Sequence, residues 1–285
     1  GSATDDLVIT GALQAGGGFN VNGGGTLRLD NAGNNHVSSV ISGGSTLKLG
    51  ANSVLGTGPV NLSQAVAGTS TLDLNGKTDA VGAALTISTA STTALGAVNR
   101  IIDSAGGGVL QLNGAVTYNA GAVGFNNGTT TISASLDLNG ALRNFNIDDS
   151  DQVAQDVVIS GVIQNSTGTS GIGKNNAGTL VLAGVNTYNG NTNVNAGTLE
   201  LADNASIKFV LGATSGDNNS INGLGTAILN GDFVIDTSAA DALPSGSWAL
   251  ENVASLTGPY GSNFTVVGFT NAGDNKWPLN CTTTP

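Results

Sequence analysis

Composition excludes several classes of protein for this chain of 285 residues. Only 9% of the residues are charged, and the net charge of −11 leaves no basic stripe to neutralise phosphates, so we expect no nucleic-acid partner. No run of about 18 apolar residues occurs, so we expect no membrane insertion. Hydrophobic residues nevertheless reach 39%, which is enough to fill a core.

Short strand-like runs begin near the N-terminus and return throughout the chain. Each alternates apolar and polar positions, which is typical of a strand with one buried face. The commonest form places Leu at the second and fourth positions, at residues 26–29, 46–49, 71–74, 109–112, 135–138, 179–182 and 198–201. Shorter apolar runs lie between them, at residues 7–9, 40–41, 60–62, 85–87, 101–102, 131–132 and 157–159. Several middle positions are charged, and we expect them to face solvent: Arg28, Lys48, Asp73, Asp137 and Glu200.

Turn signals separate these runs, and they leave two folds open. Eight Asn-Gly pairs occur, and both residues tolerate the positive φ that sharp corners require. An Asn-Gly pair between strands also predicts a β-hairpin, so a β-sandwich or an up-and-down barrel is the competing fold.

Stacked coils explain the pattern better than hairpins do. The runs are shorter than typical barrel or sandwich strands, and Leu recurs at equivalent places, as stacking requires. The runs at 26 and 46, and those at 179 and 198, are separated by about one coil of a parallel β-helix. We therefore predict an all-β parallel β-helix over residues 1–242, with roughly 12 coils and a length of roughly 60 Å at about 4.8 Å per coil.

Aromatic residues gather in the last part of the chain, at Trp248, Tyr260, Phe264, Phe269 and Trp277. The end of a solenoid needs a cover that prevents its strands from pairing with another chain. We interpret residues 243–285 as an aromatic-rich β cap of the shaft, and a docking surface or ligand platform is the alternative.

Residues 171–203 carry the most specific motif of the chain. A Gly-Thr-Leu strand at 178–182 is followed by Gly-Val-Asn-Thr-Tyr at 184–188, a Gly- and Thr-containing stretch at 190–194 and a second Gly-Thr-Leu strand at 197–201. This order resembles the passenger-associated repeat of bacterial autotransporters, also called the autotransporter-associated β-strand repeat. The resemblance implies a right-handed parallel β-helix that is exported to the cell surface or the medium and has a stalk, adhesion or matrix role. The repeat itself carries no catalytic residues.

Residues that could support catalysis or metal binding are sparse. His36 is the only histidine, in a polar stretch that predicts a surface loop, and Cys281 is the only cysteine, which excludes multi-His and Cys-rich zinc sites. Asp148, Asp149 and Asp151 could offer oxygens to Ca²⁺, but the segment lacks the central glycine and the closing glutamate of an EF-hand loop. We interpret it as a solvated acidic loop, and we predict no catalytic, cofactor-binding or metal site and no enzymatic activity.

The predicted function is that of a secreted or cell-surface structural or adhesive protein. Its expected partners are further copies of itself, in lateral or end-to-end association into a fibre or coat, or glycans of a cell surface or matrix. The alternative is a carbohydrate-binding or polysaccharide-degrading β-helix protein, for which Arg100 and Arg143 are isolated basic candidates. A passive spacer that holds another domain away from the cell is the third hypothesis.

Overall fold

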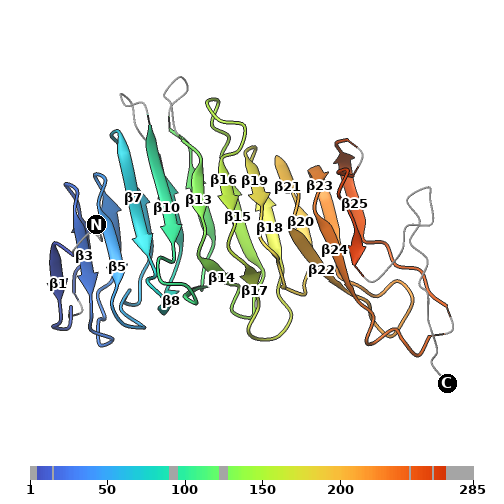
Figure 1. Cartoon of the computed structure of the whole chain (residues 1–285), viewed down its shortest axis with the longest axis horizontal. Helices are drawn as coiled ribbons and strands as arrows, with labels where there is room; N and C mark the ends of the chain where they lie inside the picture. The colour runs from blue at the N-terminus through green and yellow to red at the C-terminus, as the bar shows by residue number, and fades with distance from the viewer. Residues whose placement is uncertain are drawn as a thin grey trace.

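A computed structural model of the chain describes residues 5–14, 16–89, 96–121, 128–243, 245–258 and 260–267. Short strands stack side by side along one long axis, from the N-terminal coils at one end to β25 near the other (Figure 1). Within the described residues there is no helix, and every register between named strands is parallel. The structure confirms the predicted parallel β-helix and excludes the antiparallel sandwich and barrel.

The strands form three columns, which we call faces A, B and C in the order in which the chain passes through a coil. Face A contains β1 (Leu7–Ile9), β3 (Thr26–Leu29), β5 (Thr46–Leu49), β7 (Gly68–Asp73), β10 (Ala97–Ile102), β13 (Thr130–Ile132), β16 (Val157–Ile159), β19 (Thr179–Leu182) and β21 (Thr198–Leu201). Face B contains β8 (Thr78–Val81), β11 (Val109–Leu112), β14 (Ser135–Asp137) and β17 (Ile163–Gln164), and then β22 (Ser206–Val210), β24 (Asp232–Asp236) and β26 (Val266–Val267). Face C contains β2 (Phe19–Val21), β4 (Ser39–Ser42), β6 (Val60–Ser63), β9 (Leu85–Ser88), β12 (Val116–Asn119), β15 (Arg143–Ile147), β18 (Ile172–Asn175) and β20 (Thr192–Val194).

Faces C and A merge at the C-terminal end of the shaft. The first part of β23 (Ile221–Leu229) pairs with β20 and its last part pairs with β21, and β25 (Glu251–Leu256) adds to both parts. A register shift between Gly223 and Thr226 marks the bend. The parallel ladder therefore crosses the domain boundary that the sequence predicts after residue 242, and that boundary stays a prediction.

Coil length varies along the shaft while the strand registers hold. Leu182 lies beside Leu201, 19 residues later, whereas Ile101 lies beside Ile132, 31 residues later. Part of this difference in coil length comes from the connection between a strand of face C and the next strand of face A. The segment 148–156 between β15 and β16 is one such connection (Figure 1).

A continuous apolar ladder fills the inner side of face A. Alternation with period 2 turns every second residue of a strand inward, and parallel stacking places each on the equivalent residue of the next coil. From β5 onward these residues are at most 2% exposed. The ladder consists of Leu27, Leu47, Leu72, Ile101, Ile132, Ile159, Leu182, Leu201 and Leu229.

The Asn-Gly pairs at 75–76 and 139–140 form corners of the coil instead of hairpins. Asn75 and Gly76 have φ of 49° and 73°, and Asn139 and Gly140 have 48° and 74°, which is the conformation of a type I′ turn. An aspartate precedes each pair by two residues. Asp73 Oδ1 accepts the N–H of Asn75 at 2.9 Å, and the corresponding distance from Asp137 to Asn139 is 2.8 Å.

These two aspartates correct one expectation from the sequence. Arg28, Lys48 and Glu200 are half-buried, but Asp73 and Asp137 are buried, with exposures of 6% and 2%. Each carboxylate is buried because it accepts a second hydrogen bond, from a backbone N–H of the next coil. The donors are Ser104 at 3.0 Å for Asp73 and Ser166 at 3.1 Å for Asp137.

An aromatic cluster lies beside the last strands of face B, as the sequence predicts. The ring of Phe233 lies 4.7 Å from that of Phe209, 5.0 Å from that of Phe264 and 6.1 Å from that of Tyr260. Trp248 makes a different contact, in which its indole N–H donates to the Thr214 carbonyl at 3.3 Å. Phe269 and Trp277, which the sequence assigns to the same region, lie outside the described residues.

Replacement of Leu182 by Ala tests the apolar ladder. The side chain is fully buried, so its truncation leaves a cavity, and we expect the free energy of unfolding to fall by about 3 kcal/mol. Thr131 is exposed in the same face, so Thr131→Ala should change the value by less than about 0.5 kcal/mol. Urea unfolding followed by circular dichroism measures both, and equal losses would contradict the ladder.

Two glycine substitutions separate backbone strain from steric contact. Gly107 has φ of 84°, and an added Cβ would meet no atom within 4 Å, so Gly107→Ala should cost about 1 kcal/mol. Gly197 has φ of 65°, and its Cβ would meet the carbonyl oxygens of Asn176 and Gly178. We expect Gly197→Ala to cost about 2 kcal/mol more than Gly107→Ala in calorimetric melts. Equal costs would show that the shaft relaxes around this corner.

Candidate functional site

The acidic segment that the sequence singles out lies between β15 and β16. Asp149 and Asp151 are exposed, and half-buried Asp148 accepts the side-chain N–H of Asn176 at 2.8 Å. Among the described residues, no three side chains of the His, Cys, Asp and Glu types come together in a way that could hold a metal ion.

Asp156 is the last residue of this segment and anchors it through backbone hydrogen bonds. The carboxylate is buried, with one oxygen 2.7 Å from the Ser150 N–H and the other 2.8 Å from the Thr179 N–H. Burial raises the pKa of Asp156, although the bonds from Thr179 and Ser150 oppose the shift. The residue ties the loop to the next coil of face A.

The prediction that His36 lies in a surface loop is wrong. Its ring is buried, its Nε2 lies 2.9 Å from Ser39 Oγ, and it meets the Phe19 ring edge-on with centroids 4.7 Å apart. Burial lowers the pKa of His36. Asn34 and His36 of the polar stretch turn inward while Asn35 stays exposed, and the His36 ring packs beside an aromatic residue.

The other candidates do not form a common site. Arg100 lies in face A and donates from Nε to Thr71 Oγ1 at 3.0 Å. Arg143 begins a strand of face C, and its guanidinium donates to the carbonyls of Leu138 and Asn139 at a corner. Cys281 lies outside the described residues.

Lys174 is a buried charged residue that the sequence pattern did not single out. It occupies an inward position of face C, between Phe145 and Val194, and its side chain is fully buried. Its alternation with buried Ile172 could have revealed this position. The amine donates to three backbone carbonyls, those of Asn175 at 2.9 Å, Asn176 at 2.7 Å and Ala196 at 3.1 Å.

Three carbonyls match the three N–H groups of an ammonium ion, so the amine closes the corner between faces C and A. Burial lowers the pKa of Lys174 to about 8, while the carboxylates of Asp156, Asp148 and Asp149 favour the charged form. The ammonium ion is therefore the main form at neutral pH.

The position of Lys174 predicts a specific pH dependence of stability. Between pH 8 and 10.5 the unfolded chain keeps a proton that the folded amine has released. The unfolded state then binds more protons, so the free energy of unfolding rises with pH in this window, by at most about 3 kcal/mol relative to Lys174→Met.

Chemical denaturation at pH 7, 8, 9 and 10 measures this difference. Lys77→Met is the control, since it removes the same formal charge from a half-buried position at a corner. Parallel pH profiles for the wild type and Lys174→Met would contradict the assignment.

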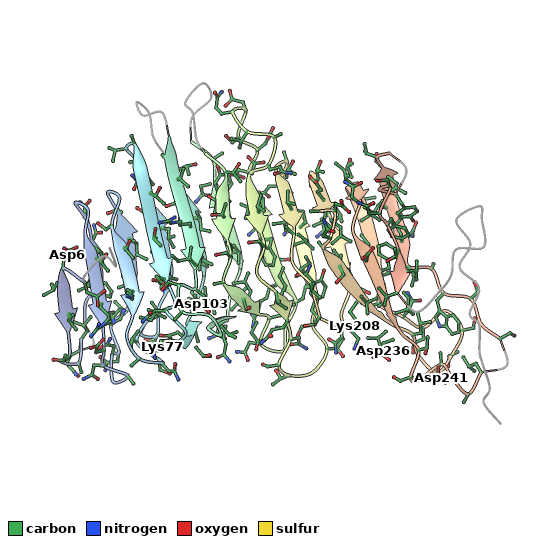
Figure 2. The ribbon with its side chains drawn as sticks, viewed as in Figure 1. Asp6, Lys77, Asp103, Lys208, Asp236 and Asp241 are labelled. Carbon is green, nitrogen blue, oxygen red and sulfur yellow. The ribbon has the colours of Figure 1, made fainter. Side chains whose placement is uncertain are left out.

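The outer side of face C is uncharged and mostly polar. Its outward positions alternate with the buried ladder residues and carry no charged side chain in the described coils. They are Asn20, Val40, Ser42, Asn61, Ser63, Thr86, Ser88, Thr117, Asn119, Asn144, Asn146, Gly173, Asn175, Asn193, Asn222 and Asn252. By contrast, Lys77, Asp103, Lys208 and Asp236 lie along one long edge of the shaft, on the side of face B (Figure 2).

Hydrogen bonds along the axis of the shaft join several of these side chains and that of Asn195, which follows β20. Asn195 donates to the Asn175 amide oxygen at 2.8 Å, Asn175 to that of Asn146 at 2.8 Å, and Asn146 to Thr117 Oγ1 at 3.3 Å. We call this series the amide ladder. The recurrence of Asn two residues apart, at 144 and 146 and at 193 and 195, is its signal in the sequence.

A hollow of about 780 Å³ lies at the C-terminal end of face C. Asn222 and Asn252, which are neighbours in the register of β23 and β25, lie in its wall together with Ser220, Leu224 and Val253. All the residues that line it are uncharged.

Comparison with protein families gives one match. Residues 173–201 match the family model of the passenger-associated-transport-repeat. The chain carries this repeat. The match runs from within β18 to the end of β21, and it includes both Lys174 and Gly197.

The resemblance that the sequence shows is thus confirmed over the same region. A β-solenoid with a passenger-associated-transport-repeat has the features of a secreted or surface passenger domain. No curated protein and no solved structure matches the chain significantly. No helix that could cross a membrane occurs in the described part of the chain.

Proposed function

We propose that the chain is the shaft of a secreted or surface-exposed passenger and that it acts as a structural or adhesive element, not as an enzyme. The apolar ladder of face A carries the proposal, because it runs without interruption from Leu27 to Leu229. Coils that pack only on their neighbours give a rod, and a rod holds whatever lies at its ends at a fixed separation.

The use of the buried carboxylates supports a non-enzymatic role. Asp79 accepts the N–H groups of Val54, Leu55 and Ala80, and Asp156 has the two bonds described above. Burial raises the pKa of Asp79, against the bonds from these N–H groups. These carboxylates serve as corner caps, whereas glycoside hydrolysis needs two carboxyl groups that flank the scissile bond.

Both ends of the shaft support end-to-end association. Among the described residues, β1 pairs with β3 alone and β25 with β23 alone, and Leu7 and Leu256 are 58% and 40% exposed. The β1 strand of another copy could add to β25 in the same parallel sense. Such a contact joins different surfaces and does not close, so it would build a fibre.

Negative-stain electron microscopy over a concentration series tests the proposal. We expect rods of roughly 50 Å, from ten spacings of about 4.8 Å between β1 and β25, that lengthen into fibres as the concentration rises. Rods of constant length would support the shaft and contradict the fibre. Compact globules would contradict the proposal as a whole.

A further inference from the structure

We propose that the outer side of face C, together with the hollow at its C-terminal end, binds an uncharged polysaccharide that lies along the axis of the shaft. This inference names the ligand class of the adhesive role proposed above and rests on it.

The amide ladder supplies the hydrogen-bonding groups. Within it, Asn175 donates one N–H to Asn146 and accepts one from Asn195. A carboxamide has two N–H groups and two oxygen lone pairs, so one donor and one acceptor remain for a ligand. The coils present such groups at intervals of about 4.8 Å, the spacing of neighbouring strands. A polysaccharide matches this array because its hydroxyl groups donate and accept at regular intervals.

Charge selects a neutral ligand. The chain has a net charge of −11, which repels acidic polymers. The outward positions of face C hold no carboxylate that could attract a basic ligand and no Lys or Arg that could attract an acidic one. Ser, Thr and Asn side chains instead match the hydroxyl groups of a neutral sugar.

The hollow provides the end of the binding surface. Its volume of about 780 Å³ falls within the usual range of small-ligand sites. Asn222 and exposed Asn252 offer amide groups, while Leu224, which is 85% exposed, and Val253 offer apolar surface. A sugar ring has both kinds of surface, with hydroxyl groups at its rim and C–H groups on its faces.

A protein partner fits this surface less well. The centres of protein interfaces are enriched in aromatic residues, Met and Arg, and the outward strand positions of face C hold none of them in the described coils. A dry contact would also bury the remaining donors and acceptors of the amide ladder, which costs free energy unless each finds a partner.

Affinity electrophoresis of the whole chain in gels that contain hydroxyethyl cellulose, dextran or galactomannan tests the proposal, with polygalacturonate as the anionic comparison. We expect retardation by at least one neutral polymer. The double variant Asn222→Asp/Asn252→Asp places two charges in the hollow and should weaken binding at least tenfold. The matched control Asn35→Asp/Asn204→Asp adds the same charge at exposed asparagines outside the hollow and should bind as the wild type does.

Three results would overturn the inference: no retardation by any neutral polymer, retardation by polygalacturonate alone, or equal binding by the two double variants. Concentration-dependent dimers in sedimentation velocity that only the hollow variant loses would assign the surface to a second copy of the chain instead. Circular dichroism confirms that each variant is folded. Rods that fail to bind overturn this inference alone, whereas the absence of rods overturns the shaft itself.

Discussion

Each coil of this protein can bury its apolar residues only against the coils on either side of it. A single coil has one layer of inward side chains and no second layer to cover them, so the ladder of face A exists only as a stack. This constraint explains why like residues recur along the chain. It also explains why the corners need so many polar caps, because every bend leaves backbone groups that the parallel ladder cannot satisfy.

The corners satisfy those groups with a small set of side chains. Asp73 and Asp137 each connect a turn to the next coil. Asp156 fixes the loop before β16. The Lys174 amine donates to three backbone carbonyls. At these corners the carboxylates accept hydrogen bonds from backbone N–H groups, and the Lys174 ammonium group donates to backbone carbonyls. The outward positions of face C carry no charge, while Lys174 of the same face is turned inward and the three aspartates lie at corners.

Sequence patterns predicted the parts of the fold that depend on repetition. The spacing of Leu residues gave the ladder, and the late aromatic residues gave the cluster around Phe233. The patterns failed where a polar residue is buried, at His36, Asp73 and Lys174. Composition assigns such residues to the surface, whereas their burial depends on contacts that only the folded coils supply, such as the Phe19 ring for His36 and the Ala196 carbonyl for Lys174. The hollow depends on the merger of two faces in β23, which no local pattern encodes.

The connection from face C to face A is where the length of a coil varies. The coil from Leu182 to Leu201 closes in 19 residues, and the coil from Ile132 to Ile159 takes 27 and includes the protruding segment 148–156, yet both keep the same ladder. The ladder keeps its register at both lengths, and each doubling of a flexible loop costs only about 0.6 kcal/mol, so we expect insertions that spare Asp156 and Lys174 to cost little stability. Successive coils can therefore gain surface loops along the edge between faces C and A while the ladder of face A stays the same.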